Sequence, residues 1–274
     1  MFYLTKQYDK VRATWVCLLN NHDTRRWLDL YREEVLNLKD EEIFKPSSSQ
    51  EDDALKIALF NMLSMPATPI IYAGDELGYY GTRIFGDRAL REPIKWADPK
   101  STCFFVDKRA NTNGNKGYVL LTLSNSLKPA EERINQEDSI YKLIQKLCQI
   151  RKDHPELAIT SPYKVLDPAY VVDADDDYSG VVVRAKTGYS SFFGMLDNNP
   201  IVGDLLFVFN NYKYKKRILP KISRNYYFKP LLLHKVKNNS WNIEIEENGY
   251  GVFELTIKSE SSLPTYYLKR PRPK

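Results

Sequence analysis

Cysteine is scarce in this chain, and the few that occur do not match the chemistry that clustered cysteines support. The 274 residues include three cysteines, Cys17, Cys103 and Cys148. Their odd number and wide spacing fit neither a disulfide framework nor a zinc or redox motif. We therefore expect free thiols, no metal centre and no cofactor in this chain.

The sequence also lacks a long apolar run and a strong imbalance of charge. No stretch approaches the roughly 20 apolar residues of a membrane-spanning helix, and the first residues have no signal-peptide core. We expect no membrane association, and this start favours the cytoplasm. Lys and Arg number 40 against 35 Asp and Glu, with basic clusters only at residues 213–217 and 269–274. We interpret both clusters as solvated surface, so we expect no nucleic-acid partner.

The first part of the chain alternates strand and helix patterns. Residues 14–19 are a short apolar run that predicts a strand buried on both faces, as in a parallel sheet. Residues 68–72 predict a second short strand. Apolar residues recur at three- and four-residue steps in three further segments, which predicts helices over residues 25–38, 49–63 and 140–150. The order indicates an α/β region.

The chain changes character beyond Pro155. Short β-prone runs follow one another at residues 180–184, 190–195, 205–209, 241–246 and 251–258. Asparagine-rich turns separate them, at Asn198–Asn199, Asn238–Asn239 and Asn248–Gly249. This pattern predicts an antiparallel all-β domain, a small β-sandwich, over residues 156–274.

A polar segment, Asn20 to Arg26, directly follows the first predicted strand. In a barrel of alternating strands and helices, reactive groups lie just past the carboxyl ends of the strands. His22 could donate to sugar hydroxyls while Asp23 accepts from them. The alternative is structural: Asp23 or Thr24 caps the next helix, the arginines are solvated, and His22 fills a strand end. The residues by themselves leave both interpretations open.

A second polar segment follows the second predicted strand. Gly74 and Gly78 flank Asp75 and Glu76, and the glycines allow a tight exit from the strand. We expect the two acidic residues to support the structure rather than to act in catalysis.

Together these segments resemble the α-amylase family of glycoside hydrolases. LLNNHDTRR (Leu18–Arg26) is similar to the family's segment at the seventh barrel strand, and MPATPIIYAGDELG (Met65–Gly78) to its eighth-strand segment. REPIKW (Arg91–Trp96) and the helix segment Pro129–Leu157 follow in the order that the family shows. The resemblance implies that residues 1–155 are the C-terminal part of a (β/α)8 TIM barrel, followed by the β-sandwich domain 156–274.

The resemblance also implies a chemistry for the first polar segment. The family cleaves α-glucans or α-glucosides with retention, using one carboxylate as nucleophile and another as acid/base. A third carboxylate holds the ring hydroxyls in the transition state, and Asp23 matches this third role. His22, Asn21 and Arg26 are expected to bind the sugar with it.

The two cleaving carboxylates have no counterpart in this sequence. The family's nucleophile lies in an Arg-x-Asp pattern at a strand end, whereas the single Arg-x-Asp here, Arg151–Asp153, ends a predicted helix. We therefore expect this chain to be inactive alone. Its open barrel edge should bind a separate chain carrying the N-terminal part of the barrel, or self-associate. The alternative is a non-catalytic split or decayed gene product with a carbohydrate-binding or assembly role.

Overall fold

A computed structural model describes ten stretches of the chain: residues 16–38, 45–65, 67–81, 90–98, 127–154, 181–184, 204–210, 216–220, 226–240 and 242–257. These stretches fall into two compact units, one up to residue 154 and one from residue 181. The predicted boundary near Pro155, the predicted strand 190–195 and the turn Asn198–Asn199 lie outside them. Within the described stretches, no helix is both long enough and apolar enough to cross a membrane.

The first unit contains a two-stranded parallel sheet. β1 (Val16–Cys17) pairs with β2 (Thr68–Pro69), and the Ile70 amide extends the pairing by donating to the Cys17 carbonyl at 2.8 Å. Both strands are shorter than the predicted runs.

The prediction that the first strand is buried on both faces is wrong. Cys17 is buried, but Val16 and Ile70 are each 48% exposed and Leu18 is 41% exposed. Neighbouring side chains point to opposite faces of a strand, so one face of this sheet packs inward and the other lies open. An apolar run indicates residues that favour burial, but only the tertiary structure decides whether other segments cover each face of the strand.

A helix follows β1 as predicted, but it passes from α-helical to π-helical geometry. α2 (Trp27–Leu30) continues directly as the π-helical segment η1 (Tyr31–Val35). Tyr31 and its neighbour Arg32 are both buried. The Arg32 guanidinium bonds to Glu51 and lies 3.8 Å from the centre of the Tyr80 ring. The wider turn thus accompanies an inward arginine that the apolar spacing could not predict.

α3 (Ser49–Ser64) begins with a capping box at Ser48. Ser48 Oγ accepts from the Glu51 amide at 3.3 Å, and Glu51 Oε2 accepts from the Ser48 amide at 2.6 Å. This reciprocal arrangement satisfies two backbone donors that the first turn leaves free.

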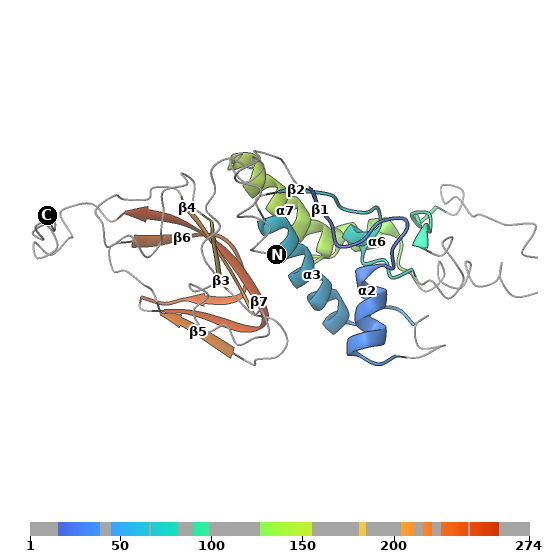
Figure 1. Cartoon of the computed structure of the whole chain (residues 1–274), viewed down its shortest axis with the longest axis horizontal. Coiled ribbons are helices and arrows are strands. Elements are labelled where there is room, and N and C mark those ends of the chain that lie inside the picture. The colour runs from blue at the N-terminus through green and yellow to red at the C-terminus, as the bar shows by residue number, and fades with distance from the viewer. Residues whose placement is uncertain are drawn as a thin grey trace, which may run out of the picture. The chain divides into compact units, whose positions relative to one another are not determined.

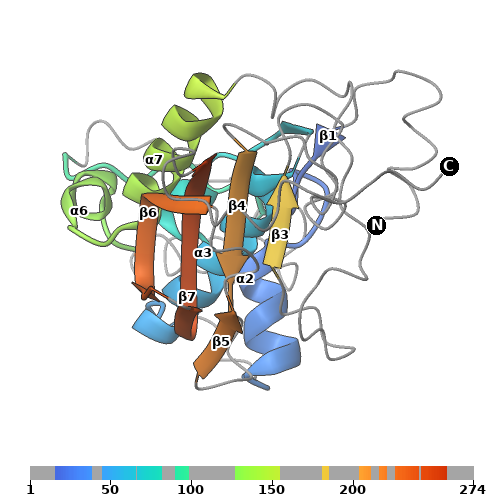
Figure 2. The same ribbon diagram turned by 90° about the vertical axis from the view of Figure 1, so that its left-hand side faces the viewer.

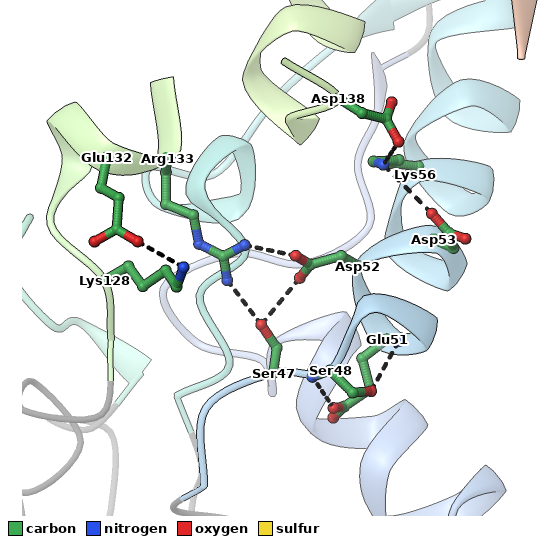
Figure 3. Close-up of polar contacts among 10 residues, drawn as sticks. All are labelled: Ser47, Ser48, Glu51, Asp52, Asp53, Lys56, Lys128, Glu132, Arg133 and Asp138. Atoms are coloured by element: carbon green, nitrogen blue, oxygen red, sulfur yellow. Dashed lines mark hydrogen bonds and ion pairs between the residues drawn. The ribbon is translucent and has the colours of Figure 1, made fainter. Parts of the chain in front are cut away.

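Further polar contacts fasten the start of α3 to a short helix that was not predicted separately, α6 (Ala130–Asn135). Arg133 on α6 donates to Asp52 at 2.5 Å and to Ser47 at 2.7 Å (Figure 3). One helical turn further on, Lys56 donates to Asp138 at 2.7 Å. These pairs join segments that are far apart in sequence.

α7 (Ile140–Asp153) lies along α3 (Figure 1), and its last turn closes the end of that helix. Arg151 Nη1 donates to the carbonyls of Leu63 and Met65 at 2.8 and 2.9 Å, and Nη2 donates to the Ala67 carbonyl at 2.5 Å. The last carbonyls of a helix have no partner within it. Arg151 therefore acts as a C-terminal cap for α3.

Among its described residues, the second unit contains a five-stranded antiparallel sheet (Figure 2). Its strands are β3 (Val181–Arg184), β4 (Asp204–Phe209), β5 (Lys216–Pro220), β6 (Tyr226–Asn238) and β7 (Asn242–Ile257). β7 pairs with β6 along one side and with β4 and β5 along the other. β5 and β6 were not predicted. A sandwich requires a second sheet, so that part of the fold class stays a prediction.

β7 corrects the predicted turn at Asn248–Gly249, because the strand continues through it. β5 pairs with the part of β7 before this point and β4 with the part after it. Asn248 has a φ of 55°, and a Cβ on Gly249 would lie 2.7 Å from the Lys235 carbonyl oxygen. The Asn210 side chain donates to the Glu246 carbonyl at 3.1 Å. Asn-Gly therefore makes a bend at which β7 changes neighbours.

We expect Arg151→Met to lower the free energy of unfolding of the first unit by on the order of 2 kcal/mol, because buried carbonyls lose their donors. Urea titration of the full chain, followed by circular dichroism at helical wavelengths, measures this. Lys152→Met is the matched control, since Lys152 is exposed. Equal losses in both variants would contradict the capping role.

Candidate functional site

The loop after β1 is a tight turn that leaves the side chains of His22 and Asp23 exposed to solvent. Asn21 Oδ1 accepts from the Asp23 amide at 2.8 Å, and the Asn21 amide donates to Thr24 Oγ1 at 2.9 Å. The Thr24 amide donates back to the Asn21 carbonyl at 3.3 Å. Because Asn21 holds the turn, the His22 and Asp23 side chains lie at its tip, 64% and 62% exposed.

The two exposed side chains contact one another and a third residue. His22 Nε2 lies 3.1 Å from Asp23 Oδ2. Arg91 Nη2 donates to Asp23 Oδ1 at 3.0 Å, while Arg91 Nε donates to the His22 carbonyl at 3.1 Å. An imidazole, a carboxylate and a guanidinium are thus gathered at the surface. Such a set offers both donors and acceptors to a ligand that carries hydroxyl groups.

These positions decide against the structural alternative for this loop. The residue at the N-cap of α2 is Arg26, and no side chain caps that helix. Neither Asp23 nor Thr24 therefore serves as its cap, and the exposed His22 does not fill a strand end. The predicted sugar-binding roles of Asn21, His22 and Asp23 stay predictions, now with a defined geometry.

Sequence reasoning did not select Arg91 as a site residue. It lies 68 positions from Asp23 and occurs in a stretch without clear helical or strand periodicity. The one available signal was its place at the start of the segment REPIKW. The tertiary structure brings this segment against the loop after β1.

Arg26 differs from the other predicted site residues because its side chain is only 1% exposed. Nη1 donates to Asp75 Oδ1 and Nη2 to the Ala73 carbonyl, both at 2.8 Å. The guanidinium also lies 4.4 Å from the centre of the Tyr72 ring. The alternative that this arginine is solvated is therefore wrong. Its sugar contact stays a prediction, whereas its protein contacts join the loops that follow β1 and β2.

The charge of Arg26 acts on two buried carboxyl groups, those of Asp75 and Glu92. Burial raises the pKa of Asp75 to about 6, although the nearby Arg26 charge and hydrogen bond lower it. Burial raises the pKa of Glu92 to about 8, and Arg26 opposes this shift as well. At pH 7 Asp75 is therefore mainly ionised and Glu92 mainly protonated. One buried cation is thus matched by one buried anion.

Several polar atoms around this cluster are not fully satisfied. Arg26 Nε and Glu92 Oε1 are buried without a hydrogen-bond partner. The Asn20 amide approaches Asp75 closely enough to lower its pKa, but with a geometry that leaves both amide atoms without a full hydrogen bond. A buried polar group left in this state costs about 1–3 kcal/mol.

Two tyrosines complete the support beneath the loops. Tyr72 Oη donates to the Leu90 carbonyl at 3.1 Å, and Tyr79 Oη accepts from the Lys95 amide at 2.7 Å. Gly74, with a φ of 99°, permits the close approach of Tyr79, since a Cβ there would lie 2.7 Å from the ring. The segment that carries Arg91 is thus fastened to the loop after β2.

We expect Glu92→Gln to change how stability depends on pH. The pKa of Glu92 in the folded chain is about 8 against an ordinary value of 4.5, so between these pH values the folded state binds more protons than the unfolded state. The stability that this group contributes is complete below pH 4.5 and is lost as the pH rises through 8. The variant should lose less stability than the native chain between pH 5 and 9, by on the order of 4 kcal/mol.

Urea titrations at a series of pH values measure this difference. Glu34→Gln is the matched control, since Glu34 is exposed. Parallel stability curves for the native chain and Glu92→Gln would rule out a protonated Glu92 at neutral pH.

Comparison with solved structures shows the fold of the α-amylase barrel proteins. The α-amylase from H. orenii matches with a TM-score of 0.56 at 17% identity, over 92% of this chain and 43% of that one. The isomaltulose synthase PalI from Klebsiella sp. LX3 also gives a TM-score of 0.56, at 16% identity, over 93% of this chain and 46% of that one. At these identities the likeness concerns the fold.

Sequence comparison finds relatives over the first part of the chain. Alpha-amylase SusG of Bacteroides thetaiotaomicron is 28% identical over 123 residues, and alpha-amylase 3 of Dictyoglomus thermophilum is 36% identical over 92 residues. These matches cover 45% and 32% of this chain but 16% of either relative. The family profile of the alpha amylase catalytic domain matches residues 2–160. This chain belongs to the α-amylase family of glycoside hydrolases.

Proposed function

We propose that this chain forms the C-terminal part of the catalytic barrel and the following β domain of a retaining glycoside hydrolase that acts on α-glucans or α-glucosides. The observation that carries the proposal is the exposed His22–Asp23 pair. It stands directly beyond a strand of a parallel sheet, the place where barrel enzymes hold their reactive groups. The family profile covers this segment.

In this proposal Asp23 holds sugar hydroxyls at the cleaved bond and stabilises the positive charge that develops on the ring. Its carboxylate accepts a hydrogen bond from Arg91 and lies 3.1 Å from His22 Nε2, and its side chain is 62% exposed, so a hydroxyl group of the sugar can reach it from solvent. His22 binds neighbouring hydroxyls, and Asn21 contributes chiefly by holding the turn. Arg26, fully buried, supports the loop from beneath.

We also propose that the nucleophile and the acid/base come from outside this chain. The Arg-x-Asp segment at Arg151–Asp153 is engaged in structure: Arg151 caps α3, and Asp153 accepts from Gln149 at 2.8 Å on the same helix. This segment ends a helix, whereas the nucleophile of this family ends a barrel strand. The chain by itself would then bind sugar without cleaving it.

The open face of β1 and β2 supports a requirement for a partner. Val16, Leu18 and Ile70 expose apolar side chains on a sheet of two strands. A polypeptide that carries the N-terminal part of the barrel would cover this face and add strands to the sheet. Without it, the same face would bind a second copy of this chain.

The first test is hydrolysis of maltoheptaose by the full chain alone and after mixing with the polypeptide that carries the remaining barrel units. We expect no cleavage by the chain alone and cleavage by the mixture. Asp23→Asn should lower kcat of the mixture by about 100-fold, because an interaction made in the transition state is lost. Asp153→Asn is the matched control and should leave kcat unchanged.

Two outcomes would refute parts of this proposal. Cleavage by the chain alone, abolished by Asp23→Asn, would show that the essential carboxylates are present here. No cleavage by either sample, together with maltoheptaose binding by the chain, would favour a non-catalytic carbohydrate-binding role.

Self-association provides a separate test. We expect light scattering to detect species larger than a monomer for the isolated chain, since apolar side chains on an open sheet are sticky. The double variant Val16→Thr, Leu18→Gln should shift the sample toward monomer. Val35→Thr is the control, since Val35 is 45% exposed but lies on the helix after β1. A native chain that is monomeric at all concentrations would contradict the open face.

A further inference from the structure

A buried cluster lies beneath the exposed His22–Asp23 pair and joins the three segments that surround it. Arg26 is at its centre, with Asp75 bonded to the guanidinium at 2.8 Å. Glu92 is buried directly after Arg91, the residue that contacts His22 and Asp23, and the Arg26 charge lowers its pKa. We call Arg26, Asp75 and Glu92 the buried cluster. Each member comes from a different segment: the loop after β1, the turn after β2, and the stretch that contains Arg91.

The members of the buried cluster are near neighbours of the exposed groups along the chain. Arg26 stands three positions after Asp23, and Glu92 directly follows Arg91. Arg91 in turn bonds to Asp23 Oδ1 and to the His22 carbonyl. A displacement of Arg26 relative to Glu92 therefore moves Asp23 relative to Arg91.

Exposed side chains gain little from packing, so their positions depend on such connections. The Asp23 side chain contacts His22 and Arg91, and the turn held by Asn21 positions its backbone. These surface ion pairs contribute little stability by themselves. The buried cluster offers the pair a rigid support, since its three members are each at most 7% exposed.

We propose that Arg26, Asp75 and Glu92 are positioning residues, which hold Asp23 against His22 and Arg91 through the backbone segments that they join. The purpose of this arrangement rests on the proposed function, but the arrangement itself is a property of the chain without sugar. Glu92 takes part as the neutral acid, so that the Arg26 charge is directed to Asp75.

A change in the protonation of Glu92 then acts on the exposed pair. When Glu92 loses its proton, two carboxylates compete for one guanidinium, and Arg26 is drawn away from Asp75. Among the described residues, other titratable groups also face the cluster: Tyr72 and Tyr79, whose rings lie 4.4 and 5.6 Å from the Arg26 guanidinium, and Glu76, on the same turn as Asp75. Burial raises the pKa of Tyr79 to about 12, so the tyrosine stays neutral while Glu92 titrates.

The test measures how fast diethyl pyrocarbonate modifies His22 in the full chain, by peptide mass spectrometry. N-acetylhistidine in the same tube corrects for decay of the reagent. We expect the contact between His22 Nε2 and Asp23 to slow the reaction in the native chain, because it occupies that ring nitrogen. Asp23→Asn serves as the reference for a released His22.

Arg26→Met and Asp75→Asn should accelerate modification of His22 by about fivefold, toward the Asp23→Asn value, the factor that corresponds to losing one hydrogen bond of about 1 kcal/mol. Arg26→Lys, which keeps the charge, should restore part of the protection. Native rates in folded Arg26→Met and Asp75→Asn chains would overturn the proposal.

Glu92→Gln tests the proposal if the other variants do not fold. We expect this variant to fold, because glutamine keeps the shape of the side chain. In the native chain, the corrected rate for His22 should rise further as the pH passes through about 8, where Glu92 ionises. This rise should be absent in Glu92→Gln and retained in the control Glu34→Gln. A rise of equal size in all three would overturn the proposal. Because no sugar is used, these results do not depend on hydrolysis.

Discussion

The buried guanidinium of Arg26 is the constraint on which the candidate site depends. A charge that is fully removed from water must be matched by an opposite charge and by hydrogen bonds. Asp75 and the Ala73 carbonyl meet this need from the loop after β2. Because Arg26 itself belongs to the loop after β1, meeting this need fixes the two loops together. The position of one loop relative to the other is therefore set by this ion pair and its hydrogen bonds, because the two strands are too short to set it.

The same logic recurs elsewhere in the first unit with other arginines. Arg32 pairs with Glu51 and lies over Tyr80, Arg133 pairs with Asp52, and Arg151 caps the end of α3. Each of them joins segments that are distant in sequence. Arginine suits this use because its planar guanidinium offers several donors in fixed directions. In a unit whose described sheet has two strands, these contacts supply connections that longer strands would otherwise make.

Within a few residues of one loop, the side chains proposed to contact sugar are exposed and the side chain that supports the loop is buried. His22 and Asp23 face solvent, while Arg26 is buried, although all three stand within one stretch of five residues. The turn held by Asn21 produces this division, since it raises the tip of the loop before α2 begins. The exposed side chains can be reached from solvent, and the buried ones hold the geometry.

The sequence by itself determined the family, the order of strands and helices in the first part, and the positions of Asn21, His22 and Asp23 beyond a strand. These features follow from residue patterns within short segments and from the order of the motifs, both of which can be read directly from the sequence. Tertiary structure alone decided that Arg91 reaches Asp23, that Arg26 is buried, and that one face of β1 is open. It also decided that Asn248–Gly249 bends one strand rather than joining two. Each of these outcomes depends on contacts between segments distant along the chain, which local propensity does not encode.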